Sequence, residues 1–161
     1  MTSWRRSSIG DLIKAYNWPI QKIASLDVPE TLRAKTLKAF QLLRRLEEAD
    51  DEGYCECVTC GVVKHYTEVH GGHWLPKGKS SYFSLDKRNV WPQCPGCNLF
   101  GMKHGVAAQN YTMFMIDKFG KSQVDQMLAD SNKPIKLYAQ DYREMIAEFN
   151  AQIKNHRSRL L

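Results

Sequence analysis

Two pairs of cysteines with the spacing of metal ligands stand near the middle of this 161-residue chain. Cys57 and Cys60 form the first Cys-x-x-Cys pair, and Cys94 and Cys97 form the second. Two intervening residues let both thiolates of a pair reach one ion from a single tight turn, and two such turns complete a tetrahedral zinc site. We therefore predict a structural Zn²⁺ held by these four cysteines, with disulfides or buried thiols as the alternative.

The fifth cysteine, Cys55, leaves the first turn ambiguous. Cys55 and Cys57 are also close enough along the chain to act as two ligands of one ion. We prefer Cys57 with Cys60 and treat Cys55 as a spare thiol without an assigned role.

The segment between the two pairs is more polar and richer in glycine than a purely structural zinc site requires. His70 and His73 enclose two glycines, a long loop leads on to Asn89, and Asn98 directly follows the last cysteine. A histidine that is neutral near working pH can take a proton from water, and an asparagine can stabilise a turn through its side chain. His104, six residues after Asn98, falls on a different face at helical spacing, so its role as a further ligand stays open.

The order and spacing of these residues resemble the HNH, or ββα-metal, nucleases. The resemblance implies that His73 is the general base, that Asn89 holds it in place, and that Asn98 on the following helix binds a catalytic metal. Most HNH enzymes carry an aspartate or histidine ligand directly before the base, whereas this chain has Gly72 there.

From about Cys57 onward the chain resembles a narrower family, the phage NinG/Rap recombination proteins. In their motif an acidic residue precedes two small residues and the histidine, and that register places His70 at the position of the acid. The resemblance implies a catalytic Mg²⁺ or Mn²⁺ held by His70 and Asn98. It also implies branched DNA, such as Holliday junctions or displacement loops, as the substrate, and a phage protein that acts in a bacterial host.

The charge of the chain favours a polyanionic partner. Lysine and arginine number 23 against 17 acidic residues, which gives a net charge of +6 with the histidines neutral. Such a balance raises encounter rates with nucleic acid. Four cations flank the proposed site and are predicted to contact DNA: Lys77, Lys79, Lys87 and Arg88.

Hydrophobic periodicity predicts helices on both sides of the central module. Apolar residues recur at helical spacing from Leu32 to Leu46 and again from Tyr142 to Ile153, after a first helix that Ser8 can cap. Val62 to Val69 reads as a strand into the loop, and Asn89 to Gln93 as a second strand.

We therefore predict an α+β fold with three parts. Residues 1–53 form an N-terminal helical arm, residues 54–104 a small zinc-bound ββα-metal core, and residues 105–161 a C-terminal helical region. The helical parts are candidates for packing or for a homodimer contact. No stretch is apolar enough for a membrane span and the start lacks a signal-peptide core, so we expect a cytoplasmic protein.

The predicted function is metal-dependent hydrolysis of DNA phosphodiester bonds by an HNH endonuclease selective for branched recombination intermediates. Three alternatives stay open. A zinc-stabilised DNA- or protein-binding module needs the four cysteines but not His73. An HNH scaffold that lost its activity with the ligand at position 72 binds DNA and cleaves nothing. A nicking or restriction-type enzyme cuts without branch selectivity.

Overall fold

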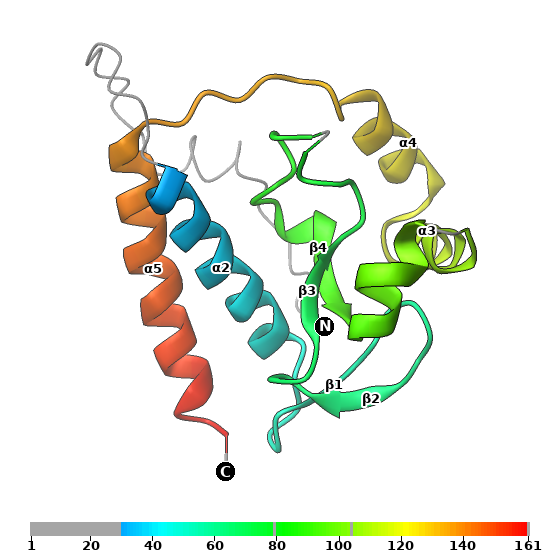
Figure 1. The fold of residues 1–161 in the computed structure, drawn as a ribbon, viewed down its shortest axis with the longest axis horizontal. Coiled ribbons are helices and arrows are strands. Elements are labelled where there is room, and N and C mark those ends of the chain that lie inside the picture. The colour runs from blue at the N-terminus through cyan, green and yellow to red at the C-terminus, as the bar shows by residue number, and fades with distance from the viewer. Residues whose placement is uncertain (1–29, 79, 104, 161) are drawn as a thin grey trace.

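The computed structural model describes residues 30–78, 80–103 and 105–160, which form a mixed α+β structure (Figure 1). Its α-helices are α2 Glu30–Glu47, α3 Val106–Phe119, α4 Lys121–Ala129 and α5 Ala139–Arg157. Its strands are β1 Tyr54–Glu56, β2 Val63–His65, β3 His70–His73 and β4 Val90–Gln93. Three short helices complete the fold: the 3₁₀ helices η1 Lys87–Asn89 and η3 Gly101–Lys103, and the π-helix η2 Gly96–Phe100. The helix predicted after Ser8 lies outside the described residues, as do Lys79 and His104.

The antiparallel pair β3–β4 lies between two layers of helices, α2 and α5 on one side and α3 and α4 on the other (Figure 1). Neighbouring residues of a strand face opposite sides of its sheet. Val90 belongs to the cluster of α2 and α5, whereas Trp91, the next residue, belongs to the cluster of α3 and α4. The two faces of this small sheet are therefore buried in two different hydrophobic cores.

Helices α2 and α5 bury their apolar stripes against each other. Phe40 of α2 and Phe149 of α5 are buried, with their ring centroids 5.3 Å apart. Leu43 and Leu46 of α2 and Ile153 of α5 are buried in the same cluster. The predicted helical stripes are thus confirmed, and packing within the chain uses them.

The strand predicted from Val62 to Val69 is confirmed only in its first half, because Val63–His65 forms β2 and residues 66–69 form a turn. Residues Val63–His65 pair with β1 in a hairpin, whereas the next strand begins only at His70 and pairs with β4. Arg45 of α2 donates hydrogen bonds of 2.9 Å to the carbonyls of Tyr66 and Val69, and so fixes the turn between the two strands.

The helix that was expected to open at Asn98 is also different. Asn98 lies inside the five-residue π-helix η2, and α3 begins only at Val106, after Gly105 with a φ of 99°. The backbone N–H of Asn98 donates to the carbonyl of Cys94 at 3.0 Å, so the cysteine turn itself fixes this short helix. Within the described ranges, no helix combines the length and the apolar character needed to cross a membrane.

Candidate metal centre and the adjoining polar site

The four cysteines of the two Cys-x-x-Cys pairs come together in space. The sulfurs of Cys57, Cys60, Cys94 and Cys97 all lie within 4.8 Å of one another, and all are free thiols. The Sγ atoms of Cys60 and Cys94 are 3.8 Å apart. A tetrahedral Zn²⁺ with bonds of about 2.3 Å separates its sulfurs by about 3.8 Å, so the cluster fits a structural zinc ion. Cys55 is not part of the cluster, which agrees with the choice of Cys57 and Cys60.

The two turns that carry the cysteines are built from local backbone hydrogen bonds. In the first turn, the backbone N–H of Cys57 donates to Val62 and that of Gly61 donates back to Cys57, both at 2.9 Å. Gly61 has a φ of 75°, which a residue with a side chain adopts rarely. In the second turn, the backbone N–H of Cys97 points at the sulfur of Cys94 at 3.5 Å. The sulfurs are thus aimed at a common point by the turns themselves.

The ionisation of this cluster favours a bound cation. Burial opposes ionisation of Cys57, but backbone N–H donors from Cys94, Thr59 and Cys60 outweigh it and lower the pKa of Cys57. The pKa of Cys97 is raised, first by burial and then by the neighbouring thiols. Four thiolates this close repel one another strongly unless a metal ion compensates their charge.

His70 and Asn98, the two predicted ligands of a catalytic ion, touch each other. Nδ1 of His70 lies 2.9 Å from the side-chain nitrogen of Asn98, and both residues are partly buried. His70 is the first residue of β3, and Asn98 stands on η2 beside the cysteine cluster. An imidazole nitrogen and an amide oxygen are atoms that divalent ions accept as ligands.

His73, the predicted base, is fixed at the other end of β3. Its Nε2 atom lies 2.9 Å from the backbone carbonyl oxygen of Ser84. Burial lowers the pKa of His73; the bond to Ser84 opposes this effect, and the nearby charge of Lys77 lowers the pKa further. The imidazole is consequently neutral at pH 7.

Asn89 is fully buried and ties the loop after β3 to the start of β4. Its side-chain oxygen accepts from the backbone N–H of Leu75 at 2.7 Å. Its nitrogen donates to the carbonyls of Leu75 and Phe83, at 3.0 Å each. Asn89 therefore bonds the backbone on both sides of the loop, and its side chain makes no hydrogen bond to the ring of His73.

The structure does not bring His73 together with the pair His70 and Asn98. His73 lies opposite Val90 and His70 opposite Gln93 in the β3–β4 register. Side chains three residues apart on a strand face opposite sides and start about 10 Å apart along it. The two histidines are thus on opposite faces of this sheet.

The four cations proposed for DNA differ in their availability. Lys77 is exposed, and Lys79 lies outside the described residues. Lys87 forms an ion pair with Glu47 of α2, and Arg88 forms one with Asp86 at 2.6 Å. Lys77 is therefore the described cation of this set without an acidic partner.

Sequence reasoning missed Gln93, the last residue of β4. Gln93 is fully buried and its side-chain nitrogen donates to the hydroxyl of Thr59, inside the first cysteine turn, at 2.6 Å. Its oxygen has no hydrogen-bond partner among the described residues, and a Cβ at Gly72 would lie 1.9 Å from it. Gln93 thus takes up the space that a side chain at position 72 would need. The signal in the sequence was a single amide side chain, that of Gln93, directly before Cys94 in an otherwise apolar strand.

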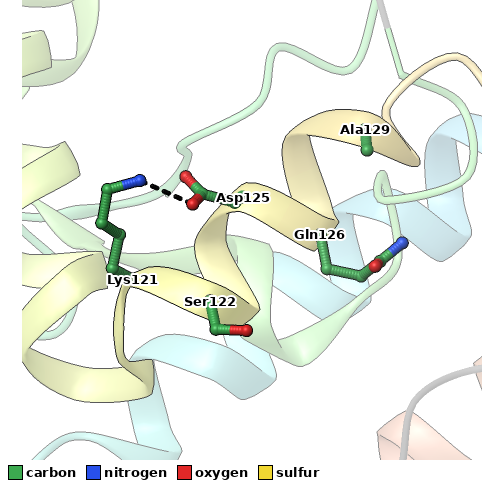
Figure 2. A pocket seen from close by; sticks show the side chains of 5 residues that line it. All are labelled: Lys121, Ser122, Asp125, Gln126 and Ala129. Atoms are coloured by element: carbon green, nitrogen blue, oxygen red, sulfur yellow. Dashed lines mark hydrogen bonds and ion pairs between the residues drawn. The ribbon is translucent and has the colours of Figure 1, made fainter.

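A shallow hollow on α4 has no connection to these residues. It is lined by five side chains (Figure 2): Lys121, Ser122, Asp125, Gln126 and Ala129. Lys121 and Asp125 pair with each other at 2.6 Å, so the charges of the hollow are compensated internally. We assign it no function.

The fold and this site define a class: a small α+β protein whose four-cysteine cluster can hold zinc. The family model described as bacteriophage lambda NinG protein matches residues 17–158. The chain therefore belongs to the NinG family of phage recombination proteins. No curated protein and no solved structure matches the chain.

Proposed function

We propose that this protein is an HNH-type, metal-dependent endonuclease that hydrolyses DNA phosphodiester bonds, with branched recombination intermediates as its substrate. The observation that carries the proposal is the contact between Nε2 of His73 and the carbonyl of Ser84. A carbonyl oxygen only accepts hydrogen bonds, so the neutral ring must carry its proton on Nε2. The lone pair of Nδ1 then remains available to take a proton from water.

Asn89 serves this chemistry by holding the loop that presents Ser84. Its three hydrogen bonds close the loop from Leu75 to Phe83 directly before Ser84. With that carbonyl fixed, the tautomer and the ring plane of His73 are fixed too. Lys77, exposed and close enough to affect the pKa of His73, is positioned to attract the substrate phosphate.

His70 and Asn98 would hold a catalytic Mg²⁺ or Mn²⁺. A bound divalent ion supplies Lewis acidity to a scissile phosphate and its leaving oxygen. The imidazole of His70 would favour Mn²⁺ more than a carboxylate at the same position would. The zinc of the cysteine cluster would keep β1–β2 and η2 in place and stay outside the chemistry. Two copies acting on a four-way junction would suit a symmetric dimer.

A zinc-stabilised DNA-binding module without cleavage is the second candidate. The placement of His73 across the β3–β4 sheet from His70 and Asn98 favours it, because a one-metal nuclease needs its base and its ion beside the same phosphate. A binding module of this kind requires the four cysteines and exposed cations such as Lys77, but neither a base nor a catalytic ion.

Cleavage of a labelled four-way junction and of a matched linear duplex, each with added Mg²⁺ or Mn²⁺, separates the two candidates. The zinc-loaded protein should cut the junction, and His73→Ala should abolish cutting while binding persists. His65→Ala is the matched control, because His65 is also partly buried on a short strand but lies outside the site. Equal cutting of both substrates refutes branch selectivity. Binding without any cutting refutes the nuclease in favour of the binding module.

A further inference from the structure

Four large apolar side chains stand exposed on the segment that follows the second cysteine turn. Phe100 is 69% exposed, Val106 is 68%, Met113 is 57% and Leu99 is 47%. Exposed apolar side chains gathered on one segment mark a binding site more often than scattered ones do. These four residues are called the 99–113 patch below.

Packing between η2, η3 and α3 holds the patch together. A Cβ on Gly101 would lie 2.7 Å from the Cβ of Ala107, so the backbone beside Phe100 rests on the first turn of α3 beside Val106. Met113 follows Val106 by two helical turns and shares its face. Leu99 and Phe100 on η2 therefore stand next to the first turn of α3, which carries Val106.

The π-helix that carries Leu99 and Phe100 is tied to the cysteine cluster and to β3, which supports an inserting side chain. Leu99 and Phe100 belong to the same π-helix as Cys97 and Asn98. Cys97 is one of the four clustered cysteines, and Asn98 contacts His70 of β3 at 2.9 Å. Short π-helices of this kind occur frequently at functional sites.

The charge around the patch suits a polyanion better than an acidic protein surface. No aspartate or glutamate occurs between Asp86 and Asp117, a stretch that contains the whole patch. Lys103, three residues after Phe100, is exposed and is not a member of any ion pair found in the described part of the chain. A phosphate beside the patch therefore meets a cation and no neighbouring carboxylate on this stretch.

We propose that Phe100, supported by Leu99, is a wedge that inserts against unstacked bases at the branch point of DNA, while Lys103 contacts the adjoining phosphate. Apolar side chains inserted between base steps are an established way to recognise deformed DNA, and a base stacks on an aromatic ring whatever its sequence. The inference rests on the DNA substrate of the proposed function, and it does not depend on cleavage.

Fluorescence of 2-aminopurine placed at the branch point of a four-way junction tests the wedge. The zinc-loaded protein, without added Mg²⁺ or Mn²⁺, should raise the fluorescence because the probe base loses its stacked neighbour. Phe100→Ala should remove this rise and weaken junction binding roughly ten-fold, whereas Phe100→Trp should retain the affinity. Leu128→Ala on α4 is the matched control, since Leu128 is 47% exposed like Leu99 but lies outside the patch.

Two results would overturn the wedge. One is a Phe100→Ala variant with normal zinc content that keeps both the fluorescence rise and the affinity. The other is light scattering that shows a dimer of the unaltered protein and a monomer of Phe100→Ala, while both proteins give the same fluorescence when bound to the junction. The 99–113 patch would then be an interface between copies of this chain. If the fluorescence rises but Mn²⁺ addition produces no cleavage, the proposed nuclease activity is refuted and the proposed role of Phe100 stands. If the protein cleaves the junction but the fluorescence does not rise, the role of Phe100 is refuted and the nuclease activity stands.

Discussion

Replacement of Asn89 by alanine should destabilise the protein more than any other single asparagine replacement in the described part of the chain. The side chain is fully buried and makes three hydrogen bonds to the loop backbone, at 2.7, 3.0 and 3.0 Å. Each such bond contributes about 1 kcal/mol net, and each buried backbone group left unpaired costs about 1–3 kcal/mol. Allowing for partial access of water to the loosened loop, we expect a loss of about 3 kcal/mol in the free energy of unfolding.

Urea denaturation of the zinc-loaded protein, followed by tryptophan fluorescence, measures this loss directly. Asn150→Ala is the matched control, because Asn150 is exposed on α5 and should change the free energy of unfolding by less than about 0.5 kcal/mol. The histidine ring signals in NMR should also shift for His73 in Asn89→Ala, since the carbonyl of Ser84 loses its fixed position. A loss below about 1 kcal/mol, with the His73 signals unchanged, would refute the assignment of Asn89 as the residue that closes the loop.

Three further measurements probe the same region. Gly72→Ala should cost about 1–3 kcal/mol by overpacking, because its Cβ would lie 1.9 Å from a buried amide oxygen, whereas Gly78→Ala, with no atom within 4 Å of its Cβ, should be close to neutral in the same urea titration. The ring of His73 should titrate in NMR with a midpoint below 6.5, because burial lowers its pKa. As the pH falls through 6.5, His73 becomes protonated in the unfolded chain before it does in the folded protein. The free energy of unfolding should therefore fall with the pH in this range. Metal analysis should find one zinc in Cys55→Ala and none in Cys94→Ala; equal zinc in both variants would contradict the assigned ligand set.

Local sequence patterns were sufficient to predict the long helices α2 and α5 and the metal cluster. The apolar residues of α2 and α5 repeat at helical spacing, and an amphipathic helix of this length forms wherever its stripe finds a partner. The two Cys-x-x-Cys turns are equally local, because each turn aims its sulfurs through hydrogen bonds within the turn itself. The sequence left the role of Cys55 ambiguous, and the structure places it on β1, ahead of the turn and outside the cluster.

The strands could not be predicted from the sequence with the same accuracy. The apolar and aromatic residues between Val62 and Val69 fit one strand, yet β2 ends at His65 and hydrogen bonds from Arg45, far away in the sequence, hold a turn before β3. Short strands gain their stability from cross-strand partners and from the layers that cover them. A pattern confined to one segment contains neither kind of contact.

The sequence by itself determined which residue types are available for chemistry: four thiolates at ligand spacing, two histidines around a pair of glycines, and asparagines at positions 89 and 98. Only the tertiary structure decided how they meet. It joined His70 to Asn98 and placed His73 across the sheet against Ser84. It also filled the space above Gly72 with Gln93. The physical reason is that side-chain direction on a strand alternates with every residue, so the face on which a residue lies depends on where the strand begins and how it is paired.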